Sequence, residues 1–239
     1  MKSILLLHGW GYSSYTKITK HETPWYSKQE FINKLKKKYN VYTPFFPGFC
    51  GEAEPKKAYD LDDYAMYVDN YIKINNLKID YILGNSFGGA VATRYKSLIN
   101  PNIPIVLIVP AVLRITTSSK KFKNTPKLIK PVRDFIRDLY VIYIKKNPEM
   151  KYGTRFLRES YQKIVRYNLI NELKKFKKNE VLILLGEYDS MVDTTTIYNE
   201  LYSKFRNNIH KIKGDHYIAE THIDELMCNI IKFTSNKYN

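Results

Sequence analysis

The sequence has 239 residues, of which 44% are hydrophobic and 26% are charged, as in an ordinary globular protein with a sizeable core. Its formal net charge of +16 comes from basic residues spread along the whole chain, which favours a solvated basic surface over a dedicated nucleic-acid site. No apolar run is long enough for a secretory signal or a membrane span. Cys50 and Cys228 can form at most one disulfide, so we expect a cytoplasmic protein with reduced thiols and no metal site.

Short apolar segments alternate with longer segments of helical periodicity, which predicts a parallel sheet with helices on both faces. Six strands are expected, at residues 4–7, 40–43, 80–83, 103–109, 181–185 and 209–212. Helices are expected at residues 25–39, 61–74, 86–99, 194–205 and 223–233. Pro24 and Asp60 directly precede two of these helices, where a proline suits the first turn and an aspartate caps the free N–H groups.

Residues 111–178 interrupt this alternation, because they contain no convincing strand and are strongly basic. We interpret them as a helical cap, with helices near 131–146 and 154–175, inserted into a core domain of residues 1–110 and 179–239. Most basic side chains of the cap are expected to face solvent, but an arginine facing the cleft would bind an anionic group of a substrate. The cap arginines are Arg114, Arg133, Arg137, Arg155, Arg158 and Arg166.

The turn after the third predicted strand reads Gly84-Asn85-Ser86-Phe87-Gly88, a G-x-S-x-G pattern between an apolar strand and a helix. Small residues two positions before and after the serine let the backbone turn sharply without clashes. The turn lifts the Ser86 hydroxyl to the N-terminus of a helix, where the helix dipole favours developing negative charge. A glycine-rich turn with a capping serine is the alternative, but the flanking strand and helix favour a nucleophile.

The first predicted strand runs into His8-Gly9-Trp10-Gly11. A backbone N–H from such a loop and one from the residue after the nucleophile bind the oxyanion of a tetrahedral intermediate, so we assign these donors to Trp10 and Phe87. The flanking glycines allow a close approach to substrate, and we expect the Trp10 indole to line the acyl pocket. His8 is expected to orient this loop and not to act as a base.

A serine nucleophile needs an adjacent base, and in this arrangement the chain order is serine, acid, histidine. The strand at 181–185 runs into a loop that carries Glu187, Asp189 and Asp193. Asp189 is the predicted acid. The alternatives are Asp193, which would otherwise cap a helix, and Glu187, which would otherwise be a solvated loop charge.

The last predicted strand runs into Lys213-Gly214-Asp215-His216, which places His216 on the loop beyond a flexible glycine. His216 is therefore the predicted base, whereas His210 within the strand and His222 near the last helix suit packing or capping. In the expected chemistry His216 takes the proton of Ser86 and later protonates the leaving group, while Asp189 orients and stabilises the imidazole.

With these residues placed, the chain resembles the α/β-hydrolase superfamily over nearly its whole length, and it is most similar to small esterases of the carboxylesterase and C–C-bond hydrolase type, including the pimeloyl-ester carboxylesterases. The matching segments are Leu7-His8-Gly9-Trp10-Gly11, Pro47-Gly48-Phe49, Leu61-Asp62-Asp63-Tyr64-Ala65, Gly84-Asn85-Ser86-Phe87-Gly88-Gly89, Gly186-Glu187-Tyr188-Asp189 and His216. The resemblance implies an α/β-hydrolase fold with a helical cap and a Ser-His-Asp mechanism without cofactor. Two departures stand out: Asn85 replaces the histidine or tryptophan of many relatives, and the first antiparallel strands of the family are missing, which leaves about six strands.

These features predict a serine hydrolase that cleaves a small or medium acyl ester through an acyl-enzyme, acting as a monomer or homodimer on a small molecule. Cleavage of an amide, a thioester or a C–C bond by the same residues is the first alternative, because one fold hosts many chemistries. A non-catalytic ligand-binding member of the fold is the second, and the complete set of Ser86, Asp189 and His216 argues against it.

Overall fold

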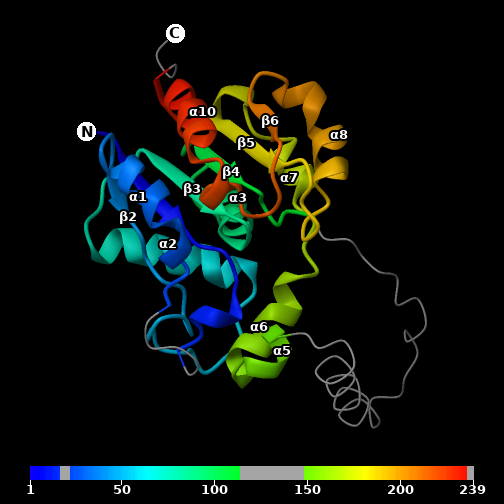
Figure 1. Ribbon diagram of the computed structural model, residues 1–239. Coiled ribbons are helices and arrows are strands. Elements are labelled where there is room, and N and C mark those ends of the chain that lie inside the picture. The colour runs from blue at the N-terminus through cyan, green and yellow to red at the C-terminus, as the bar shows by residue number, and fades with distance from the viewer. Residues whose placement is uncertain (17–21, 114–147, 236–239) are drawn as a thin grey trace, which may run out of the picture.

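The computed structural model describes residues 1–16, 22–113 and 148–235 of the chain (Figure 1). Six strands form one sheet in the order β2-β1-β3-β4-β5-β6, and every neighbouring pair is parallel. The strands are β1 (Ser3–Leu7), β2 (Asn40–Tyr42), β3 (Tyr81–Asn85), β4 (Ile105–Ile108), β5 (Val181–Gly186) and β6 (Ile209–Ile212). The predicted α/β fold with a parallel sheet of about six strands is therefore confirmed.

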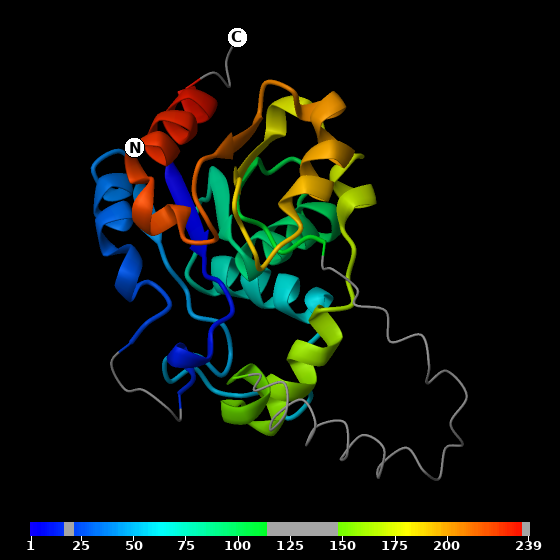
Figure 2. The ribbon, with the colours of Figure 1, turned by 45° about the vertical axis from the view of Figure 1, so that its right-hand side comes forward.

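Helices cover both faces of the sheet (Figures 1 and 2). One face packs against α1 (Gln29–Lys36), α9 (Ile218–Thr221) and α10 (Ile223–Ser235). The other packs against α2 (Leu61–Ile74), α3 (Phe87–Leu98), α7 (Ile170–Leu173) and α8 (Thr194–Phe205). Because successive strand residues point to opposite faces, both faces of each central strand are apolar and buried.

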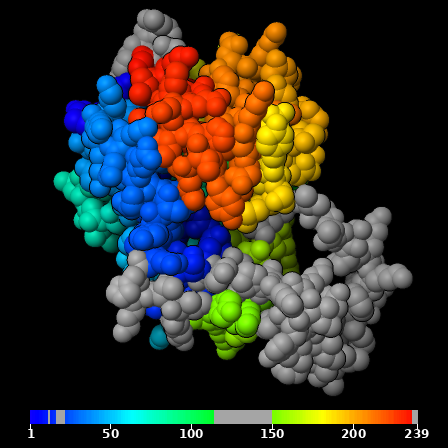
Figure 3. Space-filling model, viewed as in Figure 1, coloured from blue at the N-terminus to red at the C-terminus, as the bar shows by residue number. Residues whose placement is uncertain are grey.

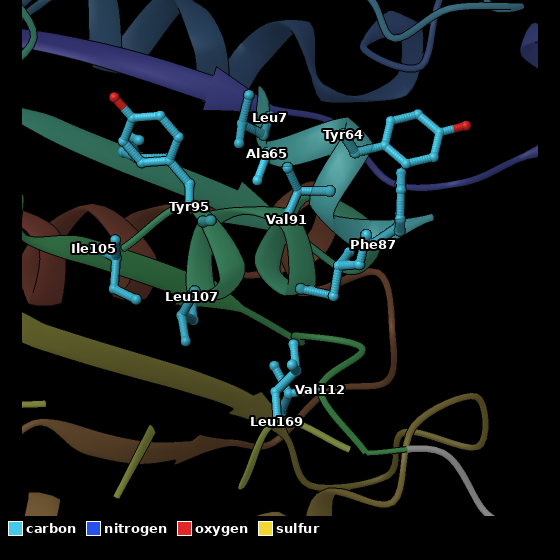
Figure 4. Packing of buried hydrophobic residues seen from close by; sticks show 14 of the residues in the cluster. Leu7, Tyr64, Ala65, Phe87, Val91, Tyr95, Ile105, Leu107, Val112 and Leu169 are labelled. Carbon is cyan, nitrogen blue, oxygen red and sulfur yellow. The ribbon is translucent and has the colours of Figure 1, made fainter. Parts of the chain in front are cut away.

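Alternation along β1 illustrates how the strands supply both cores. Leu5 and Leu7 belong to the core beneath α2 and α3, whereas Ile4 and Leu6 belong to the core beneath α1 and α10. Figure 4 shows part of the first core, in which side chains from the sheet meet those of α2 and α3. These continuous apolar strands fix the sheet firmly, so the loops at their carboxyl ends have a rigid base.

The start of α2 follows the sequence expectation. The Asp60 side chain accepts hydrogen bonds from the backbone N–H groups of Asp62 and Asp63, and the Asp63 side chain accepts one from the Asp60 N–H. This reciprocal pattern is a capping box, which satisfies N–H groups that have no partner within the helix. It fixes the start of the helix that carries the buried residues Tyr64, Ala65 and Val68.

Two predicted helices differ from the observed ones. The segment predicted at 25–39 begins as a 3₁₀ turn, η2 (Tyr26–Lys28), and only then forms α1. The segment predicted at 154–175 is two helices, α6 (Arg155–Ile164) and α7. The break arises because Leu169 is fully buried and its N–H binds the Val112 carbonyl at 2.8 Å, which pulls the chain back onto the core.

The described part of the predicted cap consists of α5 (Pro148–Tyr152), α6 and α7. Helices α5 and α6 lie to one side of the sheet (Figure 2). The Ser160 hydroxyl of α6 accepts a hydrogen bond from the Tyr59 N–H at 2.9 Å, and Tyr161 packs its ring 5.6 Å from that of Trp10. The helix predicted at 131–146, together with Arg114, Arg133 and Arg137, lies outside the described residues. None of the helices that the structure describes has the length and apolar character needed to cross a membrane.

Candidate active site

Ser86 stands between the end of β3 and the start of α3 in an unusual backbone conformation, with φ 52° and ψ −113°. Such a conformation costs a non-glycine residue about 1–3 kcal/mol and persists only where its surroundings enforce it. A Cβ at Gly84 would lie 2.3 Å from the Gly88 carbonyl oxygen, and a Cβ at Gly88 would lie 2.2 Å from the Leu7 carbonyl oxygen. The two glycines of the motif are therefore required by close backbone packing.

Backbone hydrogen bonds from the next strand hold this turn. The Ser86 N–H binds the Ile108 carbonyl at 2.9 Å, and the Ser86 carbonyl accepts the N–H of Ala111 at 3.0 Å. Val109 lies between these two contacts and also has a positive φ, of 42°. The chain after β4 thus turns sharply at Val109, and this turn allows the residues on either side of it to hydrogen-bond to Ser86. These bonds hold Ser86 in its strained conformation.

The Ser86 hydroxyl, His216 and Asp189 form a hydrogen-bonded chain. Ser86 Oγ lies 3.0 Å from His216 Nε2, and His216 Nδ1 lies 2.7 Å from Asp189 Oδ2. The Asp189 side chain has no exposed surface and that of His216 is 9% exposed. Burial by itself raises the pKa of Asp189, but the hydrogen bond and charge of His216, with the N–H groups of Met191 and Val192, hold this pKa below its usual value. An ionised Asp189 favours the imidazole tautomer in which Nδ1 carries the proton and Nε2 accepts from Ser86.

The loops after β5 and β6 bring the acid and the histidine together. The N–H of Glu187 binds the Ile212 carbonyl at 2.8 Å, and the N–H of Tyr188 binds the Gly214 carbonyl at 2.9 Å. The loop that carries Asp189 is therefore joined to the loop that carries His216 by main-chain hydrogen bonds.

The alternative acids and bases lie outside this chain of hydrogen bonds. Glu187 is exposed, and Asp193 caps α8 by accepting the Thr196 N–H at 3.0 Å. His210 lies within β6, and His222 binds the Thr221 hydroxyl through Nδ1 at 2.8 Å. The structure thus brings together the three residues that the sequence favoured and separates the alternatives from them.

Two backbone N–H groups beside Ser86 suit an oxyanion. Within the described ranges, no acceptor binds the N–H of Trp10 or of Phe87, the first residue of α3. A Cβ at Gly9 would lie 3.4 Å from Ser86 Cβ, so the loop after β1 passes directly next to the serine. The Trp10 indole donates a hydrogen bond to the Tyr15 hydroxyl at 2.7 Å, which holds the Trp10 side chain in one orientation.

His8 is fully buried and fixes the loop from beneath. The Phe46 N–H donates to His8 Nε2 at 3.0 Å, so Nε2 carries no proton and Nδ1 donates to the Gly9 carbonyl at 2.7 Å. Burial, with a smaller contribution from the charge of Lys28, lowers the pKa of His8 to about 4, although the hydrogen bond to the Gly9 carbonyl acts in the opposite direction. Both ring nitrogens are occupied, which agrees with an orienting role.

The sequence matches the model of the alpha/beta hydrolase family over residues 4–195. The chain belongs to this family. Solved structures of low sequence identity share the fold of this α/β hydrolase. A comparison with curated proteins finds no match.

Three of these solved structures illustrate the range of the fold. The meta-cleavage product hydrolase of Pseudomonas fluorescens is 17% identical, with a TM-score of 0.64, 98% of this chain covered and 91% of that chain. A bromoperoxidase of Bacillus anthracis is 17% identical, with a TM-score of 0.66 and coverages of 98% and 92%. A carboxylesterase structure from Nitrososphaera gargenis is 15% identical, with a TM-score of 0.61 and coverages of 98% and 90%. At these identities the likeness shows the fold alone.

In this α/β hydrolase, Ser86 and His216 open onto a cavity of about 540 Å³. Figure 3 shows a hollow between the blue N-terminal segments and the orange C-terminal segment that form its walls. Asn85 lines the cavity and is 6% exposed, and its side-chain oxygen has no hydrogen-bond partner in the described part of the chain. Lys28 and Glu220 also line it, and neither was singled out by the sequence.

The cap arginines that the structure describes lie elsewhere. Arg155 is exposed and pairs with Glu159 at 2.8 Å, and Arg166 is also exposed. Arg158 donates to the Thr154 carbonyl at 3.4 Å. None of these three arginines lines the cavity, so recognition of an anionic substrate by the cap stays a prediction.

The described residues contain no cluster of three or more His, Cys, Asp or Glu side chains that could hold a metal ion. Cys50 and Cys228 are both free thiols. Beside the Ser86 hydroxyl lie the His216 imidazole and two backbone N–H donors, which are groups that nucleophilic catalysis uses.

Proposed function

We propose that this α/β hydrolase is a serine esterase that cleaves carboxylic esters with a small or medium acyl group. The observation that carries the proposal is the hydrogen-bonded chain from Ser86 Oγ through His216 to Asp189, at 3.0 and 2.7 Å. It starts at a strained turn that presents the hydroxyl next to the free N–H groups of Trp10 and Phe87.

In the proposed reaction, His216 Nε2 removes the Ser86 proton as Oγ attacks the ester carbonyl. The carbonyl oxygen becomes an oxyanion, which accepts hydrogen bonds from the N–H groups of Trp10 and Phe87. One such donor is worth about 2.7–4 kcal/mol in the transition state. His216 then gives its proton to the departing alkoxide, and a water molecule activated in the same way releases the acid from Ser86.

Ring packing beside the oxyanion donors supports a small acyl group. The Trp10 ring lies 5.2 Å from those of Phe49 and Phe87, and the Tyr64 ring lies 5.0 Å from that of Phe87. Phe49, Tyr64 and Phe87 are buried, so these rings form a packed aromatic cluster with Trp10. A long acyl chain would have to displace close-packed aromatic side chains.

Turnover of p-nitrophenyl acetate tests the proposal. We expect Ser86→Ala to lower the rate about 10³-fold or more, because the variant lacks the nucleophile. Ser203→Ala, which changes an exposed serine of α8 that does not line the cavity beside Ser86, is the matched control and should keep the wild-type rate. A folded wild-type protein without activity above the Ser86→Ala background would refute the proposal.

The bond that is cleaved needs a separate comparison, because the same residues could attack an amide, a thioester or a C–C bond. A panel of butyryl substrates that differ only in the leaving group distinguishes these reactions. The proposal predicts that the oxygen ester has the highest kcat/KM relative to its uncatalysed rate. A higher relative kcat/KM for any other bond would assign the enzyme to that reaction.

A further inference from the structure

The position of His216 indicates where the alcohol part of an ester must lie. Under the proposed function, on which this inference rests, His216 Nε2 protonates the leaving oxygen and must come within hydrogen-bond distance of it. The cavity wall that follows His216 in the chain contains Tyr217 and Glu220, the latter on α9. The alcohol part of the substrate therefore enters the cavity of about 540 Å³ described above.

An ion pair forms part of this cavity wall. Lys28 Nζ on η2 lies 2.6 Å from Glu220 Oε1, although the two residues are 192 positions apart in the chain. The side chains are 12% and 24% exposed, so water reaches only part of each charged group. Lys28 also donates to the Ser27 hydroxyl at 3.3 Å, and Thr23 adds a further hydroxyl-bearing residue to the wall.

The ion pair retains hydrogen-bonding capacity that points to a ligand. The Lys28 ammonium has three N–H donors, of which Glu220 and Ser27 account for two. Glu220 Oε2 accepts no hydrogen bond from the described residues. A hydroxyl group in the cavity can donate to this carboxylate or accept from the ammonium.

An alkyl group in the same place would weaken binding. It would remove the remaining water from two charged groups and offer no hydrogen bond in return. Sites built to bind a hydroxyl reject analogues that lack it for this reason. The cavity wall thus discriminates between alcohols of equal size on the basis of their polarity.

We propose that this cavity is the leaving-group site, and that the Lys28–Glu220 ion pair selects esters of hydroxyl-bearing alcohols, such as polyols or sugars, over esters of alkyl alcohols. Lys28 and Glu220 are then specificity-determining residues for the substrate.

Two esters of the same acid and nearly the same size test this proposal: 2-hydroxyethyl butyrate and propyl butyrate, followed by acid release. Each kcat/KM is divided by the alkaline hydrolysis rate of the same ester, which removes the difference in intrinsic reactivity. The wild-type protein should prefer the hydroxyethyl ester at least tenfold. In Lys28→Met and in Glu220→Gln the preference should fall to within about threefold of one. Because both esters are measured on the same sample, partial unfolding of a variant lowers both rates and leaves the ratio unchanged.

Lys34→Met provides a matched control. It breaks the Lys34–Asp224 ion pair of 2.6 Å, which joins α1 to the start of α10. Like the Lys28–Glu220 pair it links two distant segments of the chain, but it does not line the cavity beside Ser86. This variant should keep the wild-type preference. Ester hydrolysis that depends on Ser86 but shows no preference, or a preference that survives both Lys28→Met and Glu220→Gln, would overturn the inference while leaving the proposed function intact. Absence of any Ser86-dependent hydrolysis would instead refute the proposed function.

Discussion

Gly186 and Asp215 approach so closely that a Cβ at Gly186 would lie 2.2 Å from the Asp215 carbonyl oxygen. This contact lies between the end of β5, which leads to Asp189, and the residue before His216. Close backbone packing, together with the main-chain hydrogen bonds between the two loops, therefore sets the distance between acid and histidine.

Gly186→Ala should push these two loops apart. We expect it to lower the free energy of unfolding by about 1–3 kcal/mol, as overpacking does, and to lower kcat at least tenfold. Gly11→Ala is the matched control for stability, because nothing lies within 4 Å of a Cβ at Gly11, and its effect should stay within about 0.5 kcal/mol. Urea unfolding and ester turnover measure the two effects. Equal stability of both variants would contradict the described packing.

Asp189→Asn should keep the fold but remove the charge that orients His216. We expect kcat for p-nitrophenyl acetate to fall about 10³–10⁴-fold with little change in KM, because the amide favours the wrong imidazole tautomer. The pKa of Asp189 is lowered in the folded protein, so its ionised form contributes stability above its ordinary pKa of 3.8 and this contribution is lost as the pH falls below that value. The decline in wild-type stability below pH 4 should therefore be shallower in Asp189→Asn, as measured by urea unfolding.

Protonation of His8 should make the free energy of unfolding depend on pH in a second, higher range. Its pKa of about 4 in the folded protein lies below the ordinary value of 6.5, so the unfolded chain binds the proton more readily. Stability should decrease as the pH falls from 6.5 to about 4, by about 3 kcal/mol in total for this group, and then level off. Urea unfolding of His8→Gln across this range should show a flatter profile than wild type. Parallel profiles would mean that His8 is not buried as a neutral group.

Lys96 is a fully buried cation in α3, and its hydrogen bonds join this helix to neighbouring segments of the core. Its Nζ lies 2.9 Å from both Glu180 Oε2 and the Ile103 carbonyl oxygen. Lys96→Met should lower the free energy of unfolding by about 3 kcal/mol, because the buried Ile103 carbonyl loses its donor and the Glu180 carboxylate is left with the more distant Lys177, at 3.7 Å. Lys96→Met combined with Glu180→Gln should recover part of that loss.

Activity separates this structural role from a catalytic one. Lys96 is near the C-terminal end of α3 and Ser86 precedes its first residue, so kcat/KM per folded molecule should stay at the wild-type value in Lys96→Met. A specific loss of turnover in folded protein would show that the two ends of α3 are coupled.

Much of the fold could be predicted because the signals are local. The central strands are buried along their whole length, and β1, β3 and β5 each run into a segment that carries a chemical group. In a parallel sheet such loops meet at one edge, so Ser86, Asp189 and His216 could be placed together from chain order alone. Contacts between distant segments were not predictable in this way. The break between α6 and α7 depends on Leu169 binding Val112, and neither residue carries a helix-ending signal.

Some features of the candidate site also could not be predicted from the sequence. Lys28 and Glu220 are ordinary charged residues in their local context, and only the docking of η2 against α9 brings them into the cavity beside Ser86 and His216. The hydrogen-bonded state of His8 depends on the Phe46 N–H, which comes from a loop 38 residues away. Local patterns report what a strand or turn does, whereas these roles arise from packing between elements.

Mapping the site of covalent modification tests the central claim most directly. Wild-type protein is treated with a fluorophosphonate, digested, and analysed by mass spectrometry. We predict a single adduct on the hydroxyl of Ser86, no adduct in Ser86→Ala, and much slower labelling in His216→Ala, because the serine would lack its base. Folded wild-type protein that remains unmodified, or an adduct at another residue with Ser86 untouched, would contradict the assignment of Ser86 as the nucleophile.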